Sequence, residues 1–224
     1  QRQMCIRDSL KDNASKQHIY EELKAIANLA NVYFIRQKET KGLADAILRA
    51  KSFVGNEPFG ILYGDDVILS EDPVIGQLCR AYEEFGFGAV GVKEVPREDV
   101  PKYCTLDVTP LRDNIMKCNN IIEKPTPDQI MSCYSILGRV VMPPEIFGII
   151  EQTPVDKKSG EVYFTDSMVT LAKQSGLTAV DFVGTRYDMG NKLGIMKANC
   201  EVALTHPEIG ADFKAYLQEL VRTF

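Results

Sequence analysis

The strongest constraint on the fold is a regular alternation, in the first half of the chain, of short apolar runs with longer segments of helical periodicity. Runs rich in Val, Ile, Phe and Tyr predict strands, and apolar residues three to four positions apart predict helices. The links between these segments are short, as in α/β units whose helices cover a parallel sheet. The predicted order is strand 32–37, helix 42–54, strand 59–65, helix 72–86 and strand 87–95.

The second half of the chain predicts a more irregular part of the sheet. Runs at 103–108 and 121–125 are expected to be two antiparallel strands. The other predicted elements are a helix at 16–29, strands at 134–143 and 177–184, and helices at 144–153, 165–176, 188–206 and 210–221. Thr165 or Asp166 is the expected N-cap of one helix, and another is expected to begin after Gly190.

Composition limits the partners and the compartment. The 224 residues are 45% hydrophobic and 25% charged, which is ordinary for a globular domain. The net charge is −5, and the sequence holds no basic tract that would predict binding to nucleic acid or to an anionic membrane. The six cysteines form no C-x-x-C pair, and such scattered cysteines fit reduced thiols in the cytoplasm.

The first ten residues, QRQMCIRDSL, have neither strand alternation nor a helical stripe. An internal Met4 in such a segment is typical of an assembly or gene-prediction artefact. We therefore expect residues 1–10 to be a non-native lead and residues 11–224 to form a single domain.

Two aspartates stand where predicted strands end. Asp65 closes the run FGILYGD, and Asp188, in RYDMGNK, follows the strand 177–184. Functional groups of α/β proteins gather at the carboxyl ends of strands, and Mg²⁺ often takes one or two protein carboxylates together with phosphates. Each aspartate also has an ordinary explanation, a Gly-Asp turn for Asp65 and a helix N-cap for Asp188.

The run IIEKP places a carboxylate and an ammonium group side by side, at Glu123 and Lys124. Neighbouring side chains of a regular strand point to opposite faces, but a twist at Pro125 would let both border one pocket. A glutamate can accept two sugar hydroxyls, and a lysine is a point charge for a phosphate. A surface ion pair before a proline turn is the alternative.

The order of these motifs resembles a known enzyme family. Along the chain they are RQKETKGLADAI, LYGDDVIL, KYCTLDV, IIEKPT, SILGRVV, GEVYFTDSM and YDMGNKLG. From about Leu23 to its end, the chain resembles the bacterial UTP–glucose-1-phosphate uridylyltransferases of the sugar nucleotidyltransferase superfamily. The resemblance implies an α/β fold with an incomplete Rossmann-like, GT-A-like sheet, mostly parallel with a small antiparallel part and with helices on both faces.

The resemblance also implies roles for single residues. Asp65 and Asp188 would hold a catalytic Mg²⁺, with Asp65 the stronger candidate and Asp66 supporting the turn. Glu123 would bind glucose hydroxyls, and Lys124 would meet the glucose phosphate. The expected catalytic residues are therefore Asp65, Lys124 and Asp188.

On the nucleotide side, Gln37 and Gly42 match positions that read the uracil edge, and Gly64 is expected at the nucleotide as well. Cys104 belongs to the sugar-phosphate site, where the family has a glycine whose backbone lies against the sugar. The sugar pocket is therefore expected to be tighter here. The Gly-Leu-Ala of GLADAI also occurs in related thymidylyltransferases, which leaves UTP and dTTP open.

The family opens with a strand and a G-x-G-T-R loop that wraps the phosphates of UTP with backbone N–H groups. No glycine precedes Gly42 in this sequence. We therefore expect a C-terminal fragment that lacks the first βαβ portion and is inactive by itself.

The resulting hypothesis is an enzyme that makes UDP-glucose and pyrophosphate from UTP and glucose 1-phosphate, by Mg²⁺-assisted in-line attack of the sugar phosphate on the α-phosphate. It would act in the cytoplasm, with neither nucleic acid nor membrane as partner and with a homo-oligomer left open. The alternatives are another sugar-1-phosphate nucleotidyltransferase, such as a dTTP-dependent one, and a non-catalytic sugar-phosphate-binding or regulatory protein. A metal-dependent glycosyltransferase has less support, because IIEKP precedes DMGNK in this chain.

Overall fold

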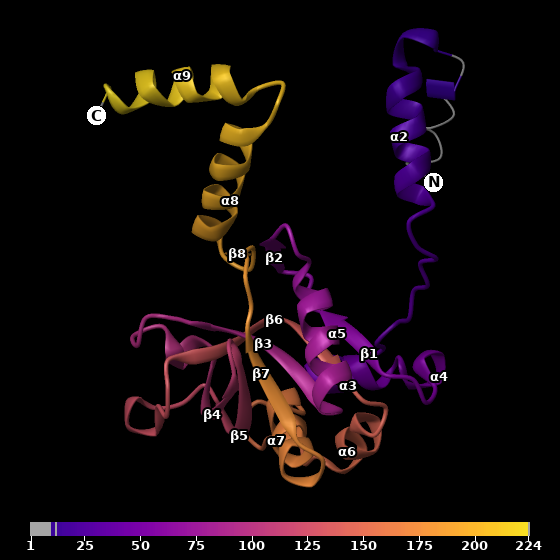
Figure 1. Cartoon of the computed structure of the whole chain (residues 1–224), viewed down its shortest axis with the longest axis vertical. Coiled ribbons are helices and arrows are strands. Elements are labelled where there is room, and N and C mark those ends of the chain that lie inside the picture. The colour runs from indigo at the N-terminus through magenta and orange to yellow at the C-terminus, as the bar shows by residue number, and fades with distance from the viewer. Residues whose placement is uncertain (1–9, 12, 224) are drawn as a thin grey trace. The chain divides into compact units, whose positions relative to one another are not determined.

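The computed structural model describes residues 10, 11 and 13–223, and the expected lead at 1–10 lies almost entirely outside this part. The chain divides into two compact units, Gln1–Arg36 and Gln37–Phe224 (Figure 1). All the residues predicted for the site belong to the second unit.

The described part of the first unit is mainly helical. It contains the short helix η1 (Ala14–Lys16) and the helix α2 (Gln17–Ala27), which confirms the helix predicted at 16–29. The strand predicted at 32–37 is wrong: this segment is extended but pairs with no strand among the described residues. Its β-branched and aromatic residues favour a strand, but a strand also needs a partner for its backbone groups.

The second unit is built on a mixed six-stranded sheet of order β1-β6-β3-β7-β5-β4 (Figure 1). The strands β3 and β7 are parallel, and the other described pairs are antiparallel. The bounds are β1 (Phe59–Leu62), β3 (Gly88–Glu94), β4 (Cys104–Arg112), β5 (Ile115–Glu123), β6 (Tyr134–Met142) and β7 (Leu177–Asp181). The predicted α/β class is confirmed. The sheet was expected to be mostly parallel, but of its described pairs β3–β7 alone is parallel, because β6 lies between β1 and β3 and runs antiparallel to both.

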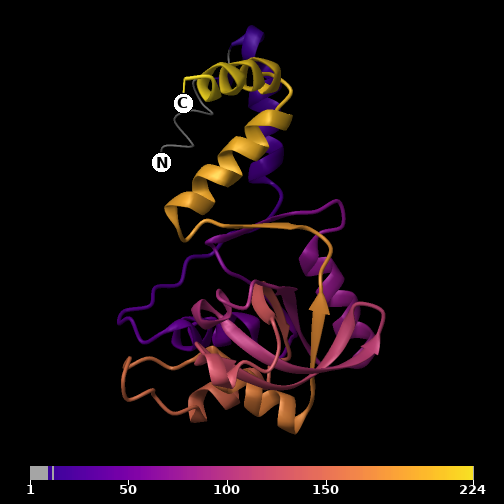
Figure 2. The same ribbon diagram turned by 90° about the vertical axis from the view of Figure 1, so that its left-hand side faces the viewer.

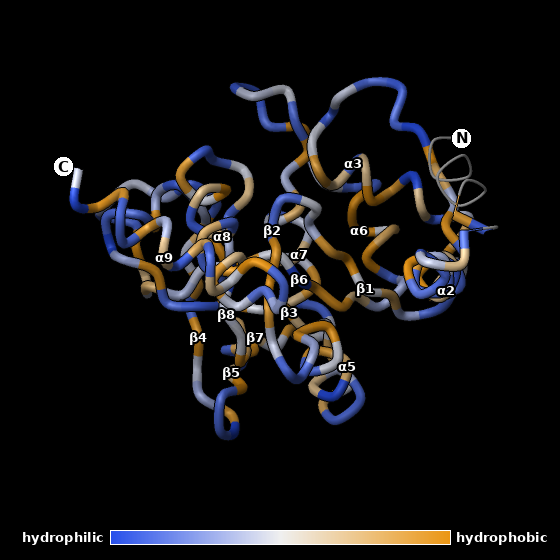
Figure 3. The backbone as a smooth tube through the Cα atoms, turned by 90° about the horizontal axis from the view of Figure 1, so that it is seen from above, coloured by the Kyte–Doolittle hydropathy of each residue, from blue (hydrophilic) through white to orange (hydrophobic). Residues whose placement is uncertain are grey.

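Helices cover both faces of this sheet, as expected. One face packs against α3 (Leu43–Leu48), α6 (Ile146–Gln152) and α7 (Phe164–Gln174), and the other against α5 (Val74–Phe85). Figure 2 shows α5 and α7 on opposite sides of β7. The alternation of side chains along β3 explains the two cores, because Val90 and Val92 face one core and Ala89 faces the other. Figure 3 shows the hydrophobic positions along the strands.

Two predicted helices differ in detail from the structure. The helix predicted at 42–54 is two helices, α3 and α4 (Lys51–Val54). The N-cap of α7 is Tyr163 rather than Thr165 or Asp166. The helix predicted after Gly190 is confirmed as α8 (Lys192–Thr205), with Asn191 as its N-cap. Asp188 is therefore not the helix cap.

The sequence analysis missed a small antiparallel ribbon. It consists of β2 (Asp66–Leu69) and β8 (Thr185–Asp188), with Asp66 opposite Asp188. The run predicted as one strand at 59–65 instead ends at Leu62, turns, and continues as β2. The ribbon brings two motifs of the sequence to the same place.

The last helices continue from this ribbon. The helix α8 contacts β8, and α9 (Gly210–Val221) contacts α8. The short helices η2 (Val100–Lys102) and η3 (Pro127–Gln129) flank the β4–β5 hairpin. Among the described residues, no helix is long and apolar enough to cross a bilayer.

Candidate active site

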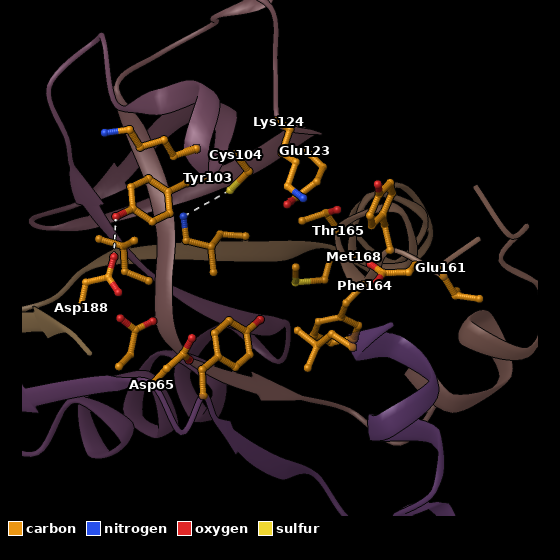
Figure 4. Close-up of a pocket in the computed structure, with 18 of the residues that line it drawn as sticks. Asp65, Tyr103, Cys104, Glu123, Lys124, Glu161, Phe164, Thr165, Met168 and Asp188 are labelled. Carbon is orange, nitrogen blue, oxygen red and sulfur yellow. Dashed lines mark hydrogen bonds between the residues drawn. The ribbon is translucent and has the colours of Figure 1, made fainter. Parts of the chain in front are cut away.

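A pocket of about 340 Å³ lies where the β1–β2 turn, the open end of the β4–β5 hairpin, the start of α7 and the end of β8 meet. Figure 4 shows its side chains, with Asp65 and Asp188 near each other and Glu123 and Lys124 across the pocket. The polar and aromatic residues that line it include Tyr63, Asp65, Asp66, Tyr103, Glu123, Lys124, Glu161, Tyr163, Thr165, Arg186 and Asp188.

A bend in the β4–β5 hairpin places its open end at the pocket, where it forms one wall. Its register shifts between Asp107 and Val108, and an extra residue on one strand bends an antiparallel pair. The open end of the hairpin is then held against β6, because the Ser135 hydroxyl donates to the Cys104 carbonyl oxygen at 2.6 Å. Cys104 and Glu123 lie opposite each other at this end.

Asp65 and Asp188 face the same small space. A Cβ added to Gly190 would lie 3.1 Å from Asp188 Oδ1 and 3.3 Å from Asp65 Oδ2. Both carboxylates therefore border the volume that this glycine leaves open. The Met189 N–H donates to the Asp65 carbonyl oxygen at 2.8 Å, which fixes the two turns together.

These two carboxylates fit a hard divalent cation that also takes oxygens from phosphate or water. No group of three or more His, Cys, Asp or Glu within the described residues could hold a metal. Mg²⁺ does not need such a group, because it commonly binds one or two carboxylates plus substrate phosphates and keeps several waters. The donor set, two carboxylates around an open space, has the chemistry that this ion requires.

Asp188 is held by several donors. The Tyr103 hydroxyl donates to Asp188 Oδ2 at 3.0 Å, and the Gly190 N–H donates to Asp188 Oδ1 at 2.9 Å. Arg186 Nη2 lies 3.8 Å from Oδ2. The carboxylate is therefore oriented and partly neutralised by the protein.

Asp66 has a different environment from Asp65, although the two are adjacent. Asp66 is buried and forms an ion pair with Arg186, while Asp65 is exposed. Burial raises the pKa of Asp66, and the hydrogen bond from Arg186 opposes this. The close packing of Asp66 explains why residue 138 is a glycine. A Cβ added to Gly138 would lie 2.6 Å from the Cβ of Asp66. Asp66 is a structural group of the β2–β8 ribbon.

Glu123 and Lys124 both line the pocket, as the sequence predicted for a distorted strand. The distortion is at Lys124 itself rather than at Pro125: β5 ends at Glu123, and Lys124 has a left-handed φ of 45°. The Lys124 N–H donates to the Tyr103 carbonyl oxygen at 2.8 Å, which holds this turn. A lysine in this conformation is strained, and such strain is common at functional sites.

The pocket perturbs the pKa of Glu123. Burial raises the pKa of Glu123, and Lys124 and the nearby Thr165 hydroxyl oppose the change. Lys124 Nζ lies 6.0 Å from the centroid of the Tyr163 ring. A carboxylate and an ammonium group on one wall can bind the hydroxyls and the phosphate of one ligand.

Cys104 lines the same wall, with its side chain buried. Its Sγ accepts the Ile136 N–H at 3.4 Å, so the thiol occupies space beside Glu123, the cross-strand partner of Cys104. Burial raises the pKa of the Cys104 thiol to about 12. This environment does not suit a nucleophile, which must be a thiolate.

The residues predicted to bind the nucleotide are placed differently. The Gln37 amide donates to Asp45 Oδ2 at 2.7 Å and to the Gly42 carbonyl oxygen at 3.3 Å, so these two predicted residues do meet. Gln37 and Gly42 are not among the described residues that line the pocket, whereas Leu43 is. Gly64 lies in the β1–β2 turn, directly before Asp65.

Sequence reasoning missed several residues that the structure brings to the pocket. The clearest are Tyr103, directly before Cys104 in KYCT, and Arg186, two positions before Asp188 in RYD. Proximity in the sequence to a predicted site residue was the signal that could have identified them. Glu161 and Thr165 come from the motif GEVYFTDSM, which was recognised but given no site residue.

Comparison with known proteins adds independent information. The family profile described as "Nucleotidyl transferase" matches residues 5–204. The chain is 39% identical to a UTP–glucose-1-phosphate uridylyltransferase of Staphylococcus epidermidis over 209 residues, which are 93% of this chain and 72% of that protein. It is 36% identical to the UTP–glucose-1-phosphate uridylyltransferase YngB of Bacillus subtilis, over 92% of this chain and 69% of that protein.

Solved structures show the same relationship. A UDP-glucose pyrophosphorylase from Acinetobacter baumannii superposes with a TM-score of 0.86 at 28% identity, over 97% of this chain and 75% of that one. A UDP-glucose pyrophosphorylase solved in complex with UDP-glucose gives a TM-score of 0.77 at 29% identity, over 95% of this chain and 78% of that one.

Proposed function

The chain belongs to the nucleotidyl transferase family, among the UTP–glucose-1-phosphate uridylyltransferases, and on this basis we propose that it joins UTP and glucose 1-phosphate to give UDP-glucose and pyrophosphate. The observation that carries the proposal is one pocket with two kinds of wall. Asp65 and Asp188 border an open space on one side, and Glu123 and Lys124 stand on the other.

The sugar phosphate is bound by the wall formed by the β4–β5 hairpin. Glu123 accepts hydrogen bonds from glucose hydroxyls, and Lys124 neutralises the phosphate. Glu123 suits the hydroxyls because its partial burial reduces its contact with water. The left-handed turn directs the Lys124 side chain into the same pocket. A fixed sugar phosphate can then approach its partner in attack geometry.

The chemical step is an in-line displacement. A phosphate oxygen of glucose 1-phosphate forms a bond to the α-phosphorus of UTP, and the bond from that phosphorus to the oxygen bridging to the β-phosphate breaks. Pyrophosphate leaves with the electron pair. Lys124 offsets part of the charge that develops on the phosphoryl oxygens, and no enzyme nucleophile is needed.

Asp65 and Asp188 are the residues that would hold Mg²⁺. The bound ion would supply charge neutralisation between the two anionic substrates. The residues of the chain orient these ligands: Tyr103 and Gly190 hold the Asp188 carboxylate, and the Gly190 backbone leaves the space open.

We assign Gln37, Gly42 and Gly64 to the nucleotide end of the site. Support comes from the contact of the Gln37 amide with Gly42 and from the position of Gly64 before Asp65. We also assign the protein to the cytoplasm, because the five cysteines in the described part of the chain are free thiols, which suits a reducing compartment.

The proposal is tested by a binding and a turnover measurement. Calorimetry with the 224-residue chain should show UDP-glucose binding that Glu123→Ala weakens strongly. Turnover is assayed as pyrophosphate release by a protein in which a G-x-G-T-R loop precedes the chain, with UTP or dTTP and with glucose 1-phosphate or galactose 1-phosphate. Preference for UTP and glucose 1-phosphate is the expected result. Failure of the loop-bearing protein to release pyrophosphate with UTP and glucose 1-phosphate would overturn the proposal.

A further inference from the structure

Tyr103 contacts both walls of the pocket. Its carbonyl oxygen accepts the Lys124 N–H at 2.8 Å, and its hydroxyl donates to Asp188 Oδ2 at 3.0 Å. Its ring lies 5.2 Å from the Arg186 guanidinium carbon, measured to the ring centroid. Figure 4 shows the dashed line between Tyr103 and Asp188.

The direction of the hydrogen bonds is defined by the donors. Arg186 can only donate, and its Nη1 lies 3.4 Å from the Tyr103 hydroxyl oxygen. The Tyr103 proton is therefore left for Asp188. Arg186 is itself fixed by its ion pair with the buried Asp66.

This chain of contacts determines which oxygen of Asp188 remains available. Oδ2 is engaged by Tyr103, so Oδ1 is directed to the space beside Gly190 and Asp65, where it accepts the Gly190 N–H and keeps one lone pair for a cation. Without the Tyr103 hydroxyl, Asp188 can turn toward Arg186 Nη2, which already lies 3.8 Å from Oδ2. An ion pair formed in this way would compete with a cation for the carboxylate.

We propose that Tyr103 is a positioning residue, which holds Asp188 in the orientation that binds a divalent cation and couples this ligand to the Lys124 turn. The proposal rests on the proposed function, because that function places the cation between Asp65 and Asp188. Tyr103 does not touch the reacting atoms in this role. Groups that orient a metal ligand from behind typically change metal affinity by 10–100-fold when they are removed.

The test uses Mn²⁺ as a paramagnetic substitute for Mg²⁺. Free Mn²⁺ is measured by electron paramagnetic resonance during titration of the 224-residue chain, with and without UDP-glucose. Tyr103→Phe removes the hydroxyl but keeps the ring and the carbonyl group. Tyr187→Phe is the matched control, because Tyr187 lies on β8 beside Asp188 and its hydroxyl donates to Glu201 at 2.8 Å. Asp188→Asn is the reference for loss of the ligand.

We expect Tyr103→Phe to weaken Mn²⁺ binding about 10–100-fold. Tyr187→Phe should bind Mn²⁺ as the wild type does, and Asp188→Asn should bind it least. UDP-glucose affinity without Mn²⁺ should be unchanged in Tyr103→Phe. Wild-type Mn²⁺ affinity in Tyr103→Phe, with loss in Asp188→Asn, would overturn the inference while leaving the proposed function intact.

Two further outcomes are informative. If the loop-bearing protein releases no pyrophosphate with UTP and glucose 1-phosphate, the proposed function fails, and the Mn²⁺ titrations alone still decide the role of Tyr103. If Asp188→Asn binds Mn²⁺ like the wild type, there is no cation site at Asp188 and the inference is wrong. Should Tyr103→Phe not fold, Tyr103→Leu, which also lacks the hydroxyl, is titrated in its place; unchanged Mn²⁺ affinity would then contradict the inference.

Discussion

At the scale of single residues, Glu123 combines two opposing requirements. In its proposed role it is an ionised acceptor of sugar hydroxyls, yet burial raises its pKa. The folded state therefore binds the Glu123 proton more readily than the unfolded state does. Stability contributed by this group is greatest below the unfolded-state pKa and falls as pH rises through the raised folded-state pKa.

The first prediction follows from this direction of the pH dependence of stability. Glu123→Gln should raise the melting temperature at pH 7, and the difference from the wild type should shrink as pH falls toward 4. Affinity for UDP-glucose should fall in the same variant. Thermal unfolding and calorimetry across pH 4–8 measure both effects, with the exposed Glu145→Gln as control. A lower melting temperature at pH 7 for Glu123→Gln would contradict the argument.

Cys104 gives a second prediction at this scale, because its buried side chain forms part of the same wall as Glu123, its cross-strand partner. Cys104→Gly should enlarge the sugar end of the pocket and free the Ile136 N–H. We expect the affinity for UDP-N-acetylglucosamine to rise about tenfold relative to that for UDP-glucose. Cys118→Ala is the control, since Cys118 is buried in the same hairpin and does not line the described pocket. An equal change in both variants would mean that the effect is not local.

At the scale of elements, the turn at Lys124 should trade stability for function. A left-handed residue with a Cβ costs about 1–2 kcal/mol. Lys124→Gly should therefore be more stable than Lys124→Ala by about 1 kcal/mol, while both lose affinity for glucose 1-phosphate. Chemical denaturation and calorimetry separate these effects.

The hairpin offers a control for this comparison. Asp113 has a φ of 48° and lies at the β4–β5 turn, away from the described pocket residues. Asp113→Gly should gain stability over Asp113→Ala by a similar amount, with ligand affinity unchanged. If Lys124→Gly retained wild-type affinity for glucose 1-phosphate, Lys124 would not be the phosphate ligand.

The β2–β8 ribbon predicts opposite effects for two adjacent aspartates. Asp66→Asn leaves Arg186 without its buried partner, and breaking such a pair typically costs about 3–5 kcal/mol. Its melting temperature should fall by about 10 °C, and its loss of Mn²⁺ affinity below the transition should be smaller than that of Asp65→Ala. Asp65→Ala should leave the melting temperature nearly unchanged and weaken Mn²⁺ binding and turnover strongly. Equal loss of turnover in both variants at low temperature would show that the ligand is wrongly assigned.

Local signals in the sequence were sufficient for much of the fold. The helix α5 was predicted to end at Gly86, and this glycine is the left-handed C-cap. The extended segment at 32–37 was mispredicted because residue preference cannot show whether a partner strand is present. The β2–β8 ribbon was missed for a related reason: each strand has four residues, too few for a clear alternation.

The candidate site shows the same division. Asp65, Glu123, Lys124 and Asp188 follow or end strands, so chain order and residue type were enough to single them out. Tyr103 and Arg186 act through contacts that are distant in sequence. The Arg186–Asp66 contact joins residues 120 positions apart, and the Tyr103–Asp188 contact spans 85. No local sequence pattern indicates contacts between residues that are so far apart in the chain.

At the scale of the whole molecule, exposed apolar side chains predict self-association. In the first unit, Leu29, Val32 and Phe34 have exposed fractions of 80%, 70% and 94%. Clustered apolar surface of this kind favours contact with another molecule. We expect the mass measured by light scattering to rise with protein concentration, and the double variant Val32→Lys, Phe34→Lys to suppress the rise.

The control for this prediction is Val155→Lys, which changes another exposed apolar residue in the second unit. It should associate as the wild type does. If the double variant also associates like the wild type, the surface responsible lies elsewhere on the chain.

The burial of Cys104 also has a consequence for how the protein meets oxidants and alkylating reagents. A thiol with a pKa of about 12 is almost wholly protonated at neutral pH, so it is a poor target for peroxide or an electrophilic inhibitor. Cys79, on α5, is exposed to both. Chemical labelling would therefore modify Cys79 on α5 before Cys104. The pocket, although it contains a cysteine sulfur, would keep its shape under oxidative stress.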